Sequence, residues 1–187
     1  MQKEEIKFCD STVFEGMTSI RAIIKSIDGG ISDRKIEKIL FDKGKMQKIS
    51  KEVGYFKAVS SKYGFELVET NSDDLEKITF GTSHGGIVAV TSDRTIPKIT
   101  EETSLPEKGF FAMIQGIEDP YNFGYALRSL YAVGADGIIL PPRNWMSAAG
   151  VVCRSSAGAS ELFKYRGYKI VCAEEKTEMC RNSTAFS

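Results

Sequence analysis

The chain has 187 residues, no net charge at pH 7, 42% hydrophobic residues and 27% charged residues, which is ordinary for a soluble globular protein. Zero net charge argues against a protein that holds nucleic acid by bulk charge alone. No run approaches the roughly 20 apolar residues of a membrane helix, and the N-terminal MQKEEIKF is not a signal peptide, so we expect a cytoplasmic protein without a membrane partner.

The first half of the chain alternates helix-like and strand-like segments. Apolar spacing predicts helices over 13–27 and 50–63, and an acidic first turn predicts a short helix over 73–78. Strands are predicted between them, at 35–41, 65–68 and 87–91. This alternation predicts a small α/β domain over 1–95 rather than an all-β binding module. Residues 96–107 contain two prolines and no periodicity, so they predict a linker to a second domain at 108–187.

The second half repeats a strand–helix–strand pattern. The uncharged run 109–115 predicts a buried strand, and Asp119-Pro120 breaks it. A helix follows, with apolar Tyr125, Leu127, Leu130, Tyr131 and Val133 and with Gly134 as its end. Further strands are predicted at 137–140 and 168–173, and a helix is predicted over 147–156. A parallel sheet is the expected result.

Polar residues gather at the turn between the first of these strands and its helix. Asn122 stands at the predicted helix entrance and Arg128 lies less than two turns further along. Open parallel sheets bind ligands beyond the carboxyl ends of their strands, so both side chains are candidates for a site there. Asn122 is equally well explained as the helix N-cap. The alternative for Arg128 is a surface arginine in a salt bridge.

Three motifs resemble one family. The central motif is Asp119-Pro-Tyr-Asn-Phe-Gly-Tyr-Ala-Leu-Arg128, which is followed by Gly-Ala-Asp-Gly-Ile-Ile; the others are Arg154-Ser-Ser-Ala-Gly-Ala159 and Ser83-His-Gly-Gly-Ile-Val-Ala89. Together they are similar to the SpoU/TrmH ribose methyltransferases of the knotted SPOUT class. These enzymes move a methyl group from S-adenosylmethionine to a ribose 2′-hydroxyl of rRNA or tRNA. The family's second and third signatures have no counterpart in this sequence.

The resemblance implies an N-terminal RNA-binding domain and an incomplete C-terminal α/β-knot methyltransferase domain. It implies catalysis by Arg128, with Asn122 beside it, and S-adenosylmethionine as the cofactor. Because a guanidinium stays protonated up to about pH 12, it does not act as a base, and Arg128 is expected to bind the adjacent phosphate and stabilise the developing alkoxide. Cofactor contacts are expected at Cys172 and Ala173, and a homodimer is expected where the C-terminal part is complete. If 187 residues are the natural length, we expect weak or absent cofactor binding and an inactive chain.

The expected partner is structured RNA. Basic residues outnumber acidic ones between Arg34 and Lys62, which favours phosphate contacts, although a solvated lysine-rich face explains the same pattern. His84, the only histidine, lies far from Arg128 in the chain and is expected to have a structural or RNA-contact role. Arg154 and Ser156 are expected on the RNA side of the second domain, although a plain helix end explains them nearly as well. The RNA-binding candidates are therefore Lys43, Lys45, Lys48, His84, Arg154 and Ser156.

The four cysteines do not have the spacing of a zinc site. Cys9, Cys153, Cys172 and Cys180 form no CxxC or Cys/His pattern, so we expect buried or inert thiols and no metal. The predicted function is 2′-O-methylation of rRNA or tRNA. The first alternative is a non-catalytic RNA-binding module. An unrelated nucleotide-binding enzyme is disfavoured, because no glycine-rich phosphate fingerprint follows any predicted strand.

Overall fold

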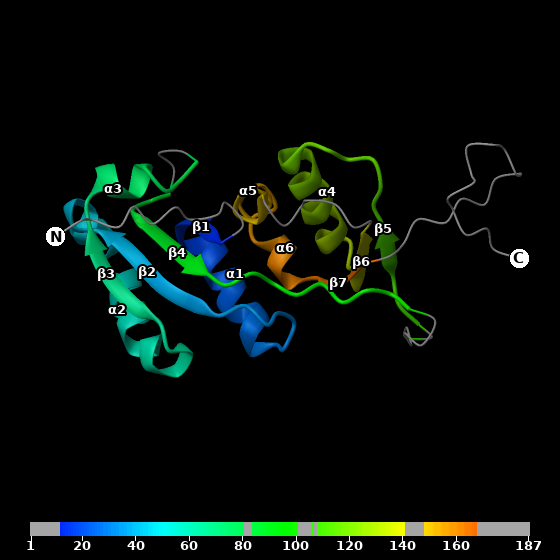
Figure 1. Cartoon of the computed structure of the whole chain (residues 1–187), viewed down its shortest axis with the longest axis horizontal. Coiled ribbons are helices and arrows are strands. Elements are labelled where there is room, and N and C mark those ends of the chain that lie inside the picture. Colours follow the sequence, from blue (N-terminus) through cyan, green and yellow to red (C-terminus); the bar gives the residue numbers. More distant parts are fainter. Residues whose placement is uncertain (1–11, 81–83, 101–105, 107, 141–147, 168–187) are drawn as a thin grey trace, which may run out of the picture.

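The computed structural model describes residues 12–80, 84–100, 106, 108–140 and 148–167. Residues 165–167 are described by their backbone alone. Its strands form a four-stranded sheet from the first half of the chain and a three-stranded sheet from the second, lying at opposite ends of an elongated molecule (Figure 1). The mixed α/β fold predicted from the sequence is confirmed.

The four-stranded sheet has the order β1-β4-β2-β3. β1 and β2 both pair with β4 antiparallel, whereas β2 and β3 pair parallel. The strands are β1 (Val13–Glu15), β2 (Ile36–Asp42), β3 (Glu66–Thr70) and β4 (Ile87–Thr91). The helices are α1 (Gly16–Asp28), α2 (Met46–Tyr63) and α3 (Ser72–Glu76), and the 3-10 helix η1 covers Lys43–Lys45.

Alternating side chains of this sheet enter two different cores. Phe14, Ile39 and Ala89 pack on one side with the apolar faces of α1 and α2. Their chain neighbours Val13 and Val88 pack on the other side with α3. Successive residues of a strand point to opposite faces of a sheet, so both faces of this sheet are covered.

The three-stranded sheet is parallel throughout and has the order β5-β6-β7. Its strands are β5 (Phe111–Met113), β6 (Gly137–Leu140) and β7 (Lys164–Gly167). The helices of this half are α4 (Pro120–Ala132), α5 (Ala149–Ser155) and α6 (Ala159–Leu162). α4 is the crossover that parallel neighbours require, and Phe123 and Leu127 pack it against Ile138 of β6.

Helix α5 belongs to both cores. Ala149 and Cys153, one turn apart, are buried in the core of the four-stranded sheet. Val152 lies in the core of the three-stranded sheet. Just after α5, Gly158 has a positive φ of 88° and lies against α1, where an added Cβ would come within 2.6 Å of the Ala22 Cβ. The two halves of the chain therefore share a packed boundary.

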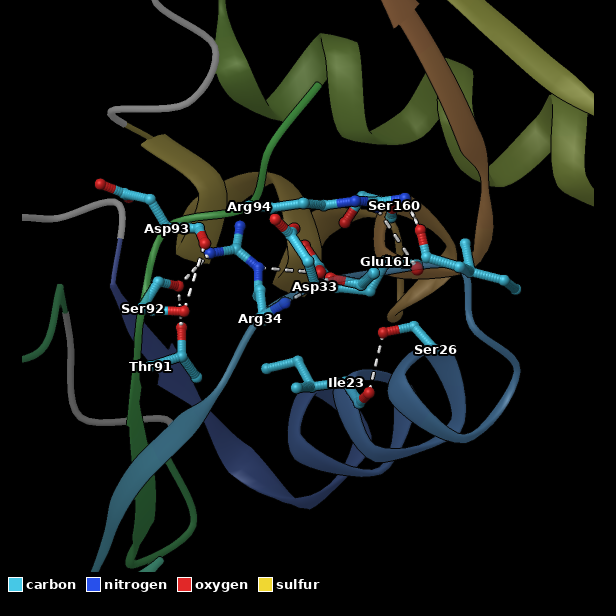
Figure 2. A network of polar contacts seen from close by, with 12 residues as sticks. Ile23, Ser26, Asp33, Arg34, Thr91, Ser92, Asp93, Arg94, Ser160 and Glu161 are labelled. Atoms are coloured by element: carbon cyan, nitrogen blue, oxygen red, sulfur yellow. Dashed lines mark hydrogen bonds and ion pairs between the residues drawn. The ribbon is translucent and has the colours of Figure 1, made fainter. Parts of the chain in front are cut away.

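A buried polar network also joins the halves (Figure 2). The Arg34 Nε donates to the Glu161 Oε2 at 3.0 Å, and its Nη1 donates to the backbone oxygen of Ser92 at 2.8 Å. The Arg94 guanidinium donates to the backbone oxygens of Ile31, at 3.0 Å, and of Phe163, at 2.6 Å. These bonds satisfy charges that would be costly to bury alone.

Some element predictions were wrong, and long-range pairing explains why. Residues 13–15 were predicted as the start of a helix but form β1, which pairs with β4 some 75 residues away in sequence. The strand β7 was not predicted, while the strand predicted at 168–173 lies outside the described residues. The boundary predicted at 96–107 stays a prediction. In the described part of the chain, no helix is both long and apolar enough to span a bilayer.

Candidate functional site

The turn that opens α4 is built by Asp119. Its Oδ2 accepts a hydrogen bond from the backbone N of Asn122 at 2.7 Å, and Pro120 occupies the first helical turn, where no intrahelical N–H bond is lost. Asp119 is therefore the N-cap, and the capping role considered for Asn122 was wrong. The Asn122 side chain is exposed.

Gly124 lets α4 approach α5 closely. A Cβ added there would lie 2.8 Å from the Ser155 Cβ, closer than packed atoms come, and 3.0 Å from the backbone oxygen of Val152, which is a very tight contact. The Ser155 hydroxyl in turn donates to the Val151 oxygen of its own helix at 2.9 Å. The glycine of the central motif thus serves helix packing and fixes where α4 lies.

Asn122 and Arg128 are both exposed on α4. Six residues correspond to a rotation of about 600°, so the two side chains leave the helix about 120° apart and about 9 Å apart along its axis. They flank the solvent-facing side of α4 rather than pointing in one direction. Within the described residues Arg128 makes no salt bridge, so the surface-pair alternative finds no support there. Their joint catalytic role stays a prediction.

His84 is fully buried, at 0% exposed, beside the start of β4. Its Nδ1 accepts a hydrogen bond from the backbone N of Gly86 at 3.1 Å, which leaves the proton of a neutral ring on Nε2. Burial, and secondarily the charge of Lys45, lowers the pKa of this imidazole. A buried neutral ring is not presented to RNA, so the structural alternative for His84 is favoured and the RNA-contact prediction is not supported.

The three candidate lysines lie where β2 passes through η1 into α2. Lys43 and Lys48 are exposed, and the Lys45 Nζ lies 3.9 Å from the Asp42 Oδ2. A hydrogen bond from Ser72, together with one from the backbone N of Gly44, lowers the pKa of the Asp42 carboxyl. This end of the four-stranded sheet therefore offers exposed cations to a partner.

Arg154 and Ser156 differ in accessibility. The Arg154 Nη1 donates to the Glu15 Oε2 at 2.8 Å, with 39% of its side chain exposed. Ser156 is buried, and its hydroxyl donates to the Cys153 oxygen and accepts from the Ser160 N. The prediction that Ser156 contacts RNA is therefore corrected, because its polar atoms are used inside the protein.

The structure brings His84 and Arg154 to one cavity. This cavity, of about 390 Å³, is lined by the first turn of α1, by Glu15, Glu52, His84 and Arg154, and by neighbouring residues. No residue of β5, β6 or α4 lines it. The cavity is therefore separate from the carboxyl end of β5, where Asn122 and Arg128 were expected to act.

Of the four cysteines, only Cys153 lies among the described residues. Cys153 is buried, and burial raises the pKa of its thiol to about 12, so it is inert at neutral pH as predicted. Cys172 and Ala173, the predicted cofactor contacts, lie outside the described residues. Among the described residues no cluster of His, Cys, Asp or Glu could hold a metal ion.

Comparisons with known proteins bear on the resemblance. No family model matches the chain. The 23S rRNA (guanosine-2'-O-)-methyltransferase RlmB of Shewanella oneidensis is 27% identical over 167 residues, covering 86% of this chain and 61% of RlmB. YacO of Bacillus subtilis, classed with the TrmH family of tRNA/rRNA methyltransferases, is 29% identical over 140 residues, covering 70% of this chain and 52% of YacO. In sequence the chain is therefore similar to RNA methyltransferases, one of them classed with the TrmH family.

Solved structures agree with this relationship in fold. The AdoMet-bound rRNA methyltransferase from Sinorhizobium meliloti superposes with a TM-score of 0.62 at 20% identity, covering 84% of this chain and 54% of that one. The SpoU methyltransferase AviRb from Streptomyces viridochromogenes, in complex with AdoMet, gives 0.59 at 17% identity, with the same coverage. The chain thus spans between about half and three fifths of the length of the proteins it matches.

Sequence reasoning missed several residues that shape the site. Glu15, which holds Arg154, is 139 positions away, and no local pattern could reveal the pair. Asp119 did carry a signal, because Asp followed by Pro is a common helix opening. Tyr125 and Val133, which belong to the apolar pattern that predicts α4, are 56% and 68% exposed. Leu127 of the same pattern is buried, together with Phe123 and Gly124.

Proposed function

We propose that this chain takes part in S-adenosylmethionine-dependent 2′-O-ribose methylation of rRNA or tRNA. The observation that carries the proposal is the match to RlmB, a guanosine-2'-O-methyltransferase, over 86% of the chain. The exposed Arg128 and Asn122 on α4, the helix that follows the first parallel strand of the C-terminal sheet, support it. Because the chain covers only 61% of RlmB, the activity of the whole enzyme is a proposal for this chain.

Arg128 acts on the ribose side of the reaction. A guanidinium cannot serve as a base near neutral pH, so its function is to bind the phosphate next to the reacting ribose. Its charge also stabilises the alkoxide that develops as the 2′-hydroxyl loses its proton. The exposed amide of Asn122 offers a donor and an acceptor on the same helix for orienting the ribose.

The cavity lined by Glu15, His84 and Arg154 is not a candidate S-adenosylmethionine site. Its Glu15 carboxylate and Arg154 guanidinium are paired with each other, and the cavity lies away from the carboxyl ends of β5 and β6. When bound, the cofactor would supply an activated methyl group. The cofactor contacts at Cys172 and Ala173 stay predictions.

The RNA-binding role is proposed for the exposed cations. Lys43 and Lys48 lie at the β2–α2 end of the four-stranded sheet, and Lys45 and Arg154 are partly exposed. Each lysine or arginine that neutralises a phosphate adds salt-dependent affinity. A homodimer and a cytoplasmic location are part of the same proposal.

A transfer assay tests this function. The chain is incubated with S-adenosylmethionine labelled in its methyl group and with bulk rRNA or tRNA, and binding of each RNA is measured in parallel. Where isothermal titration shows that the chain binds S-adenosylmethionine, we expect label in RNA from the wild-type chain and its loss in Arg128→Ala, with RNA affinity kept within a few-fold. An Arg128→Ala variant with normal turnover would remove Arg128 from the mechanism. A chain that neither binds nor labels RNA contradicts the proposal.

One alternative is favoured by a specific observation. Lys43 and Lys48 are exposed and Lys45 is partly exposed at one end of the four-stranded sheet, which fits a non-catalytic RNA-binding module built around these lysines. RNA that is bound but never labelled, together with no S-adenosylmethionine binding by isothermal titration, would select this alternative.

A further inference from the structure

Two exposed tyrosines share one face of α4 with Arg128. Tyr121, Tyr125 and Arg128 are spaced i, i+4 and i+7, so their side chains leave the helix within about 60° of one another. Tyr121 is 47% exposed and Tyr125 is 56% exposed, and Arg128 is exposed as well. The opposite face of the helix, with Phe123 and Leu127, is buried. The stripe of Tyr121, Tyr125 and Arg128 is therefore an aromatic and cationic surface on a firmly packed helix.

No other group in the described part of the chain occupies these three side chains. Neither phenol hydroxyl makes a hydrogen bond there, and neither ring packs on another ring, whereas Tyr131 of the same helix packs edge-on against Phe163 at 5.5 Å. The sequence of α4, PYNFGYALRSLYA, contains no acidic residue, so the charge of Arg128 is not offset within the helix. Large exposed aromatic rings on a soluble protein are a common mark of a binding surface.

We propose that Tyr121 and Tyr125 form a stacking platform for unpaired RNA bases. Arg128 then contacts the phosphate that links the stacked bases to the reacting ribose. This inference rests on the proposed function and deepens it, because it makes an unpaired nucleotide the substrate class. Every nucleobase has a π-face that stacks on an aromatic ring, and single-stranded or splayed-out bases are the form of RNA that proteins read in this way. A regular duplex hides those faces within its own stack.

Charge selects RNA over a protein partner for this face. The stripe combines two rings with a cation and no carboxylate, which complements a base carrying a phosphate. The tyrosine hydroxyls contribute little to stacking, so phenylalanine would serve as well. The platform therefore predicts that the ring of each tyrosine is required and that its hydroxyl is not.

Binding of the full chain to fluorescent RNA tests the platform without any methyl donor. The probes are a single-stranded oligonucleotide and a duplex of the same length, measured by fluorescence anisotropy at fixed salt. The variants are Tyr121→Ala, Tyr125→Ala and the matching phenylalanine substitutions. Val133→Ala is the matched control, because Val133 is an exposed apolar residue at the far end of the same helix. Circular dichroism melting confirms that each variant is folded.

We expect each alanine variant to bind single-stranded RNA at least about fivefold more weakly, the lower end for loss of one base stack. The phenylalanine variants and Val133→Ala should match the wild type, and the duplex should bind less tightly than the single strand. Alanine variants with unchanged affinity overturn the platform alone. A wild-type chain that binds neither RNA overturns the proposed function as well. A wild-type dimer that the alanine variants break, with RNA affinity unchanged, assigns the face to a second copy and overturns the platform.

Discussion

His84 illustrates how burial decides the role of a single residue. From sequence, the only histidine of the chain is expected to have a structural or an RNA-contact role, and the structure favours the first because it encloses the ring and ties its Nδ1 to the backbone N of Gly86. The lowered pKa then becomes a statement about stability, because the folded protein holds the ring neutral at a pH where the unfolded chain protonates it.

Stability should therefore fall as the pH drops below about 6.5, the ordinary pKa of histidine in the unfolded chain. The loss has a slope of at most about 1.4 kcal/mol per pH unit and continues down to the lowered pKa of the folded state. Urea unfolding between pH 7.5 and 5.5 measures it. His84→Asn can keep the hydrogen bond from Gly86 but does not titrate, so its stability should be flat over this range. A wild-type profile equally flat would contradict the burial argument.

The Arg34–Glu161 ion pair shows how burial sets the energetic cost of losing one partner. Only 1% and 4% of the two side chains are exposed, so removal of one partner leaves a buried, unpaired charge. Glu161→Ala should lower the free energy of unfolding by about 3–5 kcal/mol. The exposed Lys62–Asp28 pair, with the shorter N···O distance of 2.8 Å, is the matched control, and Lys62→Ala should have a far smaller effect. Comparable losses in the two variants, measured by urea unfolding, would show that burial does not set the cost.

At the scale of elements, the sequence was informative where the signal is local. The helix of 120–132 follows from Asp119-Pro120 at its start, Gly134 beyond its end and apolar spacing between them, and α2 follows in the same way from its stripe and Gly64. β1 and β7 are strands of three and four residues that exist because of distant partners. Their formation depends on tertiary pairing, which local propensity does not contain.

The close contact between α4 and α5 gives an element-scale prediction. Gly124→Ala places a methyl group against Ser155 and the Val152 oxygen, so the helices must separate, and we expect a loss of about 1–3 kcal/mol. Gly54→Ala is the control, since Gly54 lies in the exposed middle of α2 with no atom within 4 Å of an added Cβ. That substitution should stabilise by about 0.5–1 kcal/mol. Thermal or urea unfolding of both variants checks the contrast, and a neutral Gly124→Ala would mean that the helices do not pack this closely.

The whole molecule raises the question of how independent its halves are. Sequence composition at 96–107 predicts a linker between two domains, but α5 contributes to both cores and Arg34 and Arg94 bond across the boundary. No sequence pattern could show that α5 contributes to two cores, because the sequence places Cys153 and Val152 simply in one predicted helix. Only part of the candidate site could be predicted from the sequence. The exposure of Arg128 agrees with its proposed role, whereas the burial of His84 and Ser156 depends on the assembled fold.

A shared boundary predicts that the two halves unfold together. Urea unfolding followed by circular dichroism and by fluorescence of the single tryptophan should give coincident transitions. Glu161→Ala should shift both probes by the same amount, because it weakens the contact that joins the halves. Two separated transitions in the wild-type chain would instead indicate domains that fold independently on either side of a linker.

If the chain serves methyl transfer to the ribose of RNA, the new methyl group must lie on a 2′-oxygen, and its position can be measured. RNA recovered after incubation with the chain and S-adenosylmethionine is digested to nucleosides and analysed by mass spectrometry. Where the chain binds S-adenosylmethionine, we expect new 2′-O-methylated nucleosides that are missing with Arg128→Ala. A methyl group found on a base, or unmodified RNA recovered from a chain that binds both RNA and S-adenosylmethionine, would contradict it.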